Sequence, residues 1–154
     1  MPRSTLSAVR TPSSDRPSST SVMATAGSMP LLGERDIVMS RQMVRKLTQQ
    51  IKLTLVDQTK MITAASELSR NTVVYGGGGE MRWEIVQQGV KTGLRLAFED
   101  KGPGIPDIDL ALTDGWTSGS GMGVGLSGSR RLVNDFDLRT VVGEGTCVTV
   151  TRWK

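Results

Sequence analysis

The chain has 154 residues, a formal net charge of +4, one cysteine and no histidine. The lack of histidine excludes a histidine base, metal ligand or phosphoacceptor within the chain, and a single cysteine cannot form an intrachain disulfide. The sequence has no apolar run of the roughly 20 residues that a membrane span needs and no Lys/Arg cluster interleaved with aromatic residues, so we expect a cytoplasmic protein that binds neither membrane nor nucleic acid.

The N-terminal segment differs in composition from the rest of the chain. Twelve of the first thirty residues are Ser or Thr, and three Arg against one Asp give residues 1–33 a charge of +2. A segment of this kind cannot bury enough apolar surface to fold. We therefore predict a disordered tail at residues 1–33 and one folded domain at residues 34–154, which is long enough for a modest core.

Three elements are predicted in the first half of this domain. The short apolar stretch at residues 36–40 predicts a strand. Apolar residues then recur at helical spacing between residues 43 and 55 and again between residues 61 and 72, which predicts two helices. The four glycines at residues 76–79 end the second helix in a tight turn.

The second half of the domain predicts two pairs of strands separated by a long loop. Residues 81–87 and 94–100 have the pattern of a hairpin. Residues 101–125 form a loop rich in Gly, Pro and Ser, with a short helix near residues 109–112. A further helix and two strands are predicted to complete the chain, at residues 126–134, 138–142 and 146–153.

Blocks of helices and hairpins therefore alternate along the chain, in the order βαα, ββ, loop, αββ. This order predicts a mixed or largely antiparallel sheet with the helices on one face. The expected fold class is α+β, as a two-layer sandwich, and a doubly wound α/β fold is not expected because the strands come in hairpins.

The long loop places glycines where a ligand needs a close approach to the backbone. They follow the end of a strand and precede the start of a helix (Gly102, Gly104, Gly121, Gly123 and Gly125). The helix start directs free amide groups and a positive dipole end at an anion such as a phosphate. No Walker P-loop sequence occurs, and no strand directly precedes the match to the dinucleotide-binding fingerprint at residues 123–128, so we discount that match.

Three polar side chains outside the glycines suit a bound nucleotide. Asp100 ends a strand, where its carboxylate can accept a hydrogen bond from an exocyclic amine such as that of adenine. Glu67 and Asn71 are four residues apart and share a helical face. The amide oxygen of Asn71 is a suitable ligand for Mg²⁺, and Glu67 can deprotonate a hydroxyl. Each residue taken alone is more typical of a turn or an exposed helix face, so the prediction depends on their combination.

The combination resembles the GHKL ATPases, which have the Bergerat fold, and within them the RsbT-type serine/threonine kinases of the bacterial stressosome. The resemblance covers roughly residues 34–154. It is carried by segments in the family's order: ELSRN at 67–71, EDKGPGIPD at 99–107, DGWTS at 114–118, GMGVGL at 121–126, GEGT at 143–146 and RWK at 152–154.

The resemblance implies a site for ATP and Mg²⁺ with a role for each matched residue. Asn71 would hold Mg²⁺, Asp100 would bind the adenine amine, and Glu67 would be the general base for the substrate hydroxyl. The first glycine box and the last turn would line the base pocket, and the second glycine box would wrap the phosphates (Gly102, Gly104, Thr146; Gly121, Gly123, Gly125, Leu126).

Two features depart from the family pattern. No Lys or Arg lies between residues 107 and 125, so the lid segment offers no cation for the γ-phosphate. Arg130 and Arg131 are candidates to supply it, and a solvated helix face is the alternative. Trp116 stands where the family usually has another aromatic residue, and we expect it to pack at the base of the lid.

The implied function is that of a serine/threonine protein kinase that phosphorylates STAS-domain proteins in a partner-switching pathway and, once released, binds an activator target such as a PP2C-type phosphatase. Two alternatives remain: an anti-sigma factor kinase that binds a sigma factor, and a non-catalytic, nucleotide-dependent binding module. The binding module would keep Asp100 and the glycines but would not need Glu67. The lack of histidine excludes a kinase that phosphorylates its own histidine.

Overall fold

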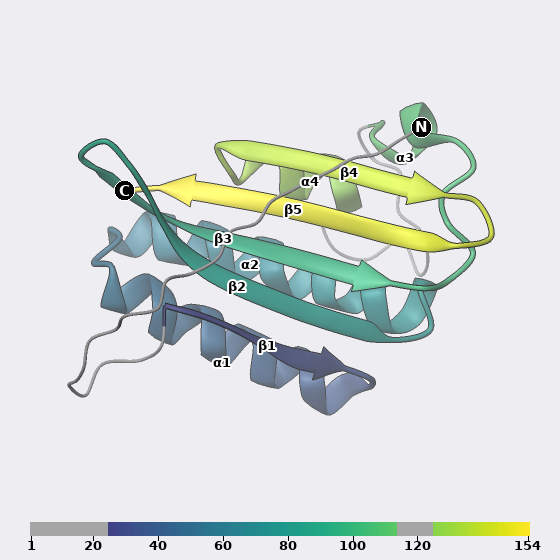
Figure 1. Cartoon of the computed structure of the whole chain (residues 1–154), viewed down its shortest axis with the longest axis horizontal. Helices are drawn as coiled ribbons and strands as arrows, with labels where there is room; N and C mark the ends of the chain where they lie inside the picture. The colour runs from purple at the N-terminus through teal and green to yellow at the C-terminus, as the bar shows by residue number, and fades with distance from the viewer. Residues whose placement is uncertain (1–24, 114–124) are drawn as a thin grey trace.

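The computed structural model describes residues 25–113 and 125–154 as one sheet with helices packed against it (Figure 1). None of the helices in these residues is long and apolar enough to cross a membrane. The elements in chain order are β1 (Ala26–Leu31), α1 (Glu34–Gln50), α2 (Leu55–Arg70), the π-helical turn η1 (Asn71–Tyr75), β2 (Gly79–Gln88), β3 (Lys91–Asp100), α3 (Ile108–Ala111), α4 (Gly125–Arg131), β4 (Asp135–Val141) and β5 (Gly145–Trp153).

The sheet has five strands in the order β1-β2-β3-β5-β4, and every neighbouring pair is antiparallel. Helices α1, α2 and α4 lie on one face of it, and α3 lies beside the end of the sheet where β3 stops (Figure 1). The predicted α+β two-layer sandwich is therefore confirmed, and the sheet is antiparallel throughout. Strand β3 is its central strand, so Asp100, at its last position, lies at the middle of one sheet end.

The core forms between the helices and one face of the sheet because strand side chains alternate. Met81, Phe98 and Val148 are register partners on three adjacent strands, and all three are buried. They pack under buried residues of α1 and α2 such as Val44 and Leu68. Burying each large apolar side chain contributes on the order of 1.5–3 kcal/mol. This contiguous core fixes the position of β3 against α2, which are the two elements that carry the predicted site.

The first strand lies earlier in the chain than we predicted. Residues 36–40 are not a strand, because α1 begins at Glu34. The buried residues of this helix recur at helical spacing, whereas Val38 and Met39 are 37% and 47% exposed and only happen to extend the apolar run. The carboxylate of Asp36 accepts a hydrogen bond from the backbone N–H of Leu32 at 2.8 Å, which fixes the entry into the helix.

Strand β1 lies inside the range that we expected to be disordered, and it pairs with β2 over its whole length. Leu31 is fully buried at its end. Gly27 leaves room for the ring of Trp83 on β2, because a Cβ atom at Gly27 would lie 2.5 Å from that ring. Small residues such as glycine add little to the apolar pattern of a sequence. The composition of this segment therefore did not indicate a strand.

The other predicted elements are present with boundaries that shift by a few residues. The hairpin β2–β3, the short helix α3, the helix α4 and the closing strands β4 and β5 match the predictions. The helix predicted at residues 61–72 begins earlier, at Leu55, where the Thr54 side chain accepts a hydrogen bond from the backbone N–H of Asp57. It ends in the π-helical turn, which the sequence pattern did not predict.

Two buried serines join α1 to the segment of α2 that carries the predicted polar residues. The hydroxyls of Ser40 and Ser69 lie 2.8 Å apart, and both residues are fully buried. Ser69 lies between Glu67 and Asn71 in the sequence, so this hydrogen bond holds that part of α2 at a fixed distance from α1. Buried hydroxyls that satisfy one another in this way specify one helix spacing.

An ion pair between Arg152 and Asp57 ties the end of β5 to the start of α2. Arg152 Nη2 lies 2.7 Å from Asp57 Oδ1, Nη1 donates to the carbonyl of Leu132, and the two charged side chains are only 15% and 23% exposed. We expect Asp57→Asn to lower the free energy of unfolding by about 2–3 kcal/mol, since it leaves a poorly solvated guanidinium without its counterion.

Denaturant unfolding would measure this change, with Asp137→Asn as the matched control. Asp137 pairs with Arg139 at a similar distance of 2.8 Å, but both side chains are more than half exposed. Surface pairs of this kind contribute at most about 1 kcal/mol. Equal losses in the two variants would contradict a structural role for the Arg152 pair.

Candidate active site

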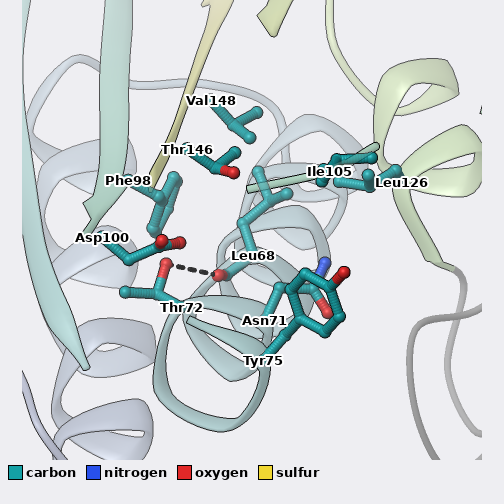
Figure 2. A pocket seen from close by; sticks show the side chains of 10 residues that line it. All are labelled: Leu68, Asn71, Thr72, Tyr75, Phe98, Asp100, Ile105, Leu126, Thr146 and Val148. Carbon is teal, nitrogen blue, oxygen red and sulfur yellow. Dashed lines mark hydrogen bonds between the residues drawn. The ribbon is translucent and has the colours of Figure 1, made fainter. Parts of the chain in front are cut away.

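A cleft lies between the end of α2 and the adjoining ends of β3 and β5 (Figure 2). Ten side chains from four parts of the chain line it. They are Leu68, Asn71, Thr72, Tyr75, Phe98, Asp100, Ile105, Leu126, Thr146 and Val148. Four of the predicted site residues are in this set, namely Asn71, Asp100, Leu126 and Thr146.

Asp100 is the one carboxylate among these ten residues, and it is only 8% exposed. Its Oδ1 accepts a hydrogen bond from the backbone N–H of Gly102 at 2.9 Å. Burial raises the pKa of Asp100, hydrogen bonds from the backbone N–H groups of Gly102 and Thr146 lower it, and the charge of Glu99 raises it. The carboxylate is thus fixed by the backbone and still reaches the cleft, where it can accept a hydrogen bond from a ligand amine.

Two glycines bring backbone segments into direct contact around this carboxylate. A Cβ atom at Gly76 would lie 2.3 Å from the carboxyl carbon of Asp100, and one at Gly102 would lie 2.6 Å from the carbonyl oxygen of Gly76. The sequence pattern predicted that a ligand approaches the backbone at Gly102, and the contact seen there is with the backbone of Gly76. It identified Gly76 only as part of a turn, because a run of four glycines does not show which one meets another segment.

The position of Gly76 gives a direct test of this packing. Gly76 has φ −83°, a backbone conformation open to any residue, so Gly76→Ala introduces steric overlap with Asp100 and no backbone strain. Overpacking of this kind costs about 1–3 kcal/mol. We expect the affinity for a ligand held by Asp100 to fall by about tenfold or more, as measured by calorimetric titration.

Gly33→Ala is the matched control, because Gly33 has an extended backbone at φ −165° and no atom lies within 4 Å of a Cβ built there. This variant should bind as the unchanged protein does. If both variants bind equally well, the contact between Gly76 and Asp100 does not shape the ligand site.

The loop after β3 is attached to the turn between β4 and β5. The backbone N–H of Ile105 donates to Thr140 Oγ1 at 2.8 Å, and the Thr140 and Thr146 hydroxyl oxygens lie 2.9 Å apart. Gly104 has φ +78°, and a Cβ there would lie 2.5 Å from the carbonyl oxygen of Val141. The predicted positions Gly104 and Thr146 are therefore held together, and Thr146 presents its side chain to the cleft.

The π-helical turn after α2 forms the opposite wall. Asn71, Thr72 and Tyr75 from this turn all line the cleft (Figure 2). Turns of this kind occur often at functional sites, because the wider turn redirects side chains. Thr72 donates to the carbonyl of Leu68 at 3.0 Å, which completes the wall. The sequence pattern identified Asn71 but missed Thr72 and Tyr75, although Tyr75 is one helical turn beyond Asn71.

Glu67 is half-buried and lies one turn before Asn71 on α2, outside the set of residues that line the cleft. Arg70, the residue that could have paired with it, lies 3.7 Å from Glu34 instead. Glu67 has no hydrogen bond or ion pair with another residue that the structure describes. Within residues 25–113 and 125–154, its carboxylate is therefore not committed to a structural contact.

The second glycine box is described only in part. Gly125 has φ +67° and is buried at the start of α4, and the next residue, Leu126, lines the cleft. Gly121, Gly123 and Trp116 lie outside the described residues. Arg130 and Arg131 are exposed in the last turn of α4, and neither is among the residues that line the cleft.

Comparisons with known proteins agree with this geometry. Residues 56–154 match the family described as histidine kinase-, DNA gyrase B- and HSP90-like ATPases. The chain is 42% identical over 123 residues to the serine/threonine-protein kinase RsbT of Bacillus subtilis, which is 80% of this chain and 92% of that protein.

Among solved structures, the RsbU and RsbW domains of Rv1364c from Mycobacterium tuberculosis superpose with a TM-score of 0.57 at 16% identity. The match covers 83% of this chain and 33% of that one, so it supports the fold.

Proposed function

The chain belongs to the histidine kinase-, DNA gyrase B- and HSP90-like ATPases and, within them, to the RsbT-like serine/threonine kinases of partner-switching stress pathways. From this premise we propose that it transfers the γ-phosphoryl group of ATP to a serine or threonine of STAS-domain partner proteins. The observation that carries the proposal is the cleft in which Asp100, fixed by two backbone N–H groups, faces the π-helical turn that presents Asn71.

The base of ATP would occupy the apolar end of the cleft. Phe98, Ile105 and Val148 supply apolar contact, and Asp100 beside them would accept a hydrogen bond from the adenine amine. Gly102 and Gly104 let the loop after β3 pack closely against Gly76 and Val141 beside this region, and Thr146 borders it from β5. An apolar pocket with one fixed polar group is the usual arrangement for a recognised base.

The phosphates and the metal ion would occupy the other end. Asn71 presents an amide group to the cleft, and a neutral amide oxygen suits Mg²⁺, which completes its six ligands with water and phosphate oxygens. The bound ion would neutralise charge on the phosphates. The backbone around Gly121, Gly123 and Gly125 would wrap the phosphates, which agrees with the left-handed backbone of Gly125 and with Leu126 next to it in the cleft wall.

Glu67 is the proposed general base. It shares a helix face with Asn71 one turn away, and its carboxylate has no partner among the described residues. It would take the proton of the acceptor hydroxyl while the hydroxyl oxygen forms a bond to the γ-phosphorus and the bond to the ADP oxygen breaks. Most of the catalysis would come from the alignment of the two reactants and from charge neutralisation.

The decisive experiment is phosphotransfer from γ-labelled ATP to candidate STAS-domain proteins in the presence of Mg²⁺. We expect label on a serine or threonine of at least one partner and no transfer when Mg²⁺ is chelated. A phosphorylated partner should then release the kinase, which would become free to bind a PP2C-type phosphatase.

ATP binding without transfer to any partner would favour a nucleotide-dependent binding module over an enzyme. Tight binding of a sigma factor would favour an anti-sigma factor kinase.

A further inference from the structure

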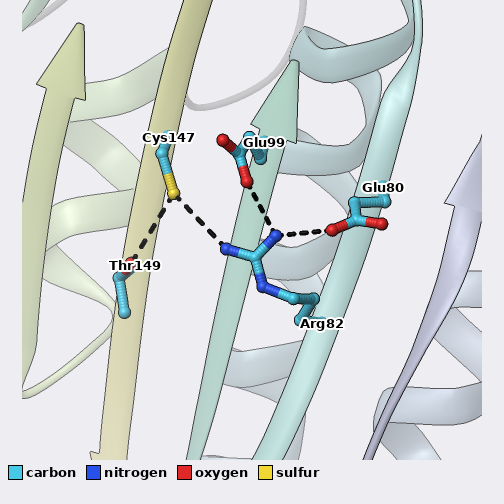
Figure 3. A network of polar contacts seen from close by, with 5 residues as sticks. All are labelled: Glu80, Arg82, Glu99, Cys147 and Thr149. Carbon is cyan, nitrogen blue, oxygen red and sulfur yellow. Dashed lines mark hydrogen bonds and ion pairs between the residues drawn. The ribbon is translucent and has the colours of Figure 1, made fainter. Parts of the chain in front are cut away.

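A charged cluster lies on the face of the sheet that the helices leave open (Figure 3). Side chains alternate along a strand, so Glu99 lies on this face while its neighbour Asp100 enters the cleft. Glu80 on β2 and Cys147 on β5 are the register partners of Glu99. The cluster and the base-binding end of the cleft therefore share the last two residues of one strand.

Arg82 lies at the centre of this cluster. Its Nη1 lies 2.7 Å from Glu99 Oε1 and also pairs with Glu80 Oε2, and its Nη2 lies 4.0 Å from the sulfur of Cys147. Glu80 and Glu99 are directly opposite each other on adjacent strands, where two like charges are destabilising. One guanidinium thus holds two carboxylates that would otherwise repel each other.

The charge states within the cluster follow from its geometry. Burial lowers the pKa of Arg82, but hydrogen bonds to Glu99 and Glu80 outweigh burial, so the pKa is raised and the guanidinium stays charged. Burial, together with Glu99, raises the pKa of Cys147, which therefore remains a neutral thiol. The charge that matters to Asp100 is that of Glu99, which disfavours a second carboxylate beside it.

The cluster supplies most of the charged groups around Asp100. The titratable residues that share a pocket wall with this carboxylate are Tyr75, Glu80, Glu99 and Lys101, and Arg82 and Cys147 join Glu99 in the cluster. Lys101 is exposed and burial keeps the Cys147 thiol neutral, so Arg82 and the two glutamates are the charged groups of this cluster next to Asp100.

We propose that Arg82 is a positioning residue for nucleotide recognition, which acts through Glu99 from the far face of the sheet to keep Asp100 ionised. This inference rests on the proposed role of Asp100 as acceptor for the adenine amine. A protonated Asp100 would present a hydroxyl group to that amine in place of a free carboxylate oxygen. Arg82 is not among the residues that line the cleft, so it would act only through its charged neighbours.

The test is the pH dependence of adenosine binding, followed by NMR titration from pH 8 down to the pH at which the protein begins to unfold. Adenosine carries no phosphate, so phosphate titration does not enter the measurement. Affinity is full above the pKa of Asp100 and is lost as the pH falls through it. In Arg82→Gln the loss of adenosine affinity should begin at a higher pH than in the unchanged protein. At the acid end of the titration the variant should bind roughly threefold more weakly than the unchanged protein, and at pH 8 the two affinities should be equal.

Glu99→Gln should move the midpoint of this loss in the opposite direction, to lower pH. The double variant should return it toward that of the unchanged protein. Arg95→Gln is the matched control, because Arg95 also pairs with a glutamate on the same face of β3 but lies four residues from Glu99. It removes the same charge and should leave the midpoint in place.

Each outcome has a separate meaning. Weaker binding at every pH without a moved midpoint in Arg82→Gln would mean a structural role only, and the proposal would be wrong. Thermal unfolding at each pH shows whether Arg82→Gln folds. If that variant does not fold, an unchanged midpoint in Glu99→Gln would also show that the proposal is wrong. Failure of the unchanged protein to bind adenosine, or undiminished binding by Asp100→Asn, would instead contradict the proposed nucleotide site.

Discussion

Asp100→Asn is expected to weaken ATP binding by about 10- to 100-fold. The substitution keeps the shape of the side chain, but it removes the charge and can place an N–H group where the adenine amine donates. A hydrogen bond to a charged group contributes about 1.5–3 kcal/mol, and each 1.4 kcal/mol is a factor of ten in affinity. The low exposure of Asp100 prevents water from compensating for the lost contact. Calorimetric titration with ATP would measure the change.

Inosine triphosphate provides the sharper comparison, because it carries an oxygen in place of the adenine amine. The unchanged protein should bind ATP much more tightly than inosine triphosphate, and Asp100→Asn should lose most of that preference. Asp137→Asn, which changes an exposed carboxylate on β4, should leave both affinities unchanged. If Asp100→Asn keeps the full preference for ATP over inosine triphosphate, a group other than Asp100 distinguishes the two bases.

Glu67→Gln is expected to lower the rate of phosphotransfer by about a hundredfold or more while ATP affinity stays unchanged. A general base contributes about 10²- to 10⁴-fold to a rate, and glutamine has nearly the same shape without the basic oxygen. Affinity should persist because Glu67 does not line the cleft and has no structural partner among the described residues. Single-turnover transfer to a partner protein, beside ATP titration of the same sample, separates the two quantities.

Glu84→Gln is the control for this substitution, since Glu84 is a glutamate on the far face of β2, where it pairs with Arg95. It should transfer phosphate at the rate of the unchanged protein. Full transfer by Glu67→Gln would remove the general base from the mechanism, and the alignment of reactants and Mg²⁺ would then account for the whole rate.

The features that could be predicted from the sequence are those that depend on residues close together in the chain. Asp100 ends an apolar strand and is followed by Gly102, so the point where the strand enters the loop was visible from these residues alone. The hairpin β2–β3 and the closing strands were visible from runs of strand-forming residues bounded by glycine. The helix face that carries Asn71 was visible because helical spacing repeats over several turns.

The features that the sequence missed depend on contacts between distant segments. Gly76 is critical only because Asp100, 24 residues later, packs against it. Val38 and Met39 suggested a strand, because a short apolar run does not show which of its residues will be exposed. The cluster around Arg82 requires the register of three strands, which no local pattern contains.

The central position of β3 links the nucleotide to the stability of the whole domain. Asp100 is the last residue of the middle strand, and its partners across the sheet are Gly79 and Thr146. Breaking the strand pairs at the middle of the sheet would therefore displace the carboxylate that the ligand needs. A ligand that binds only the folded state stabilises it by about 2.7 kcal/mol at a concentration one hundred times its Kd. ATP would thus act as a folding ligand, and the fraction of folded kinase would follow the nucleotide concentration around it.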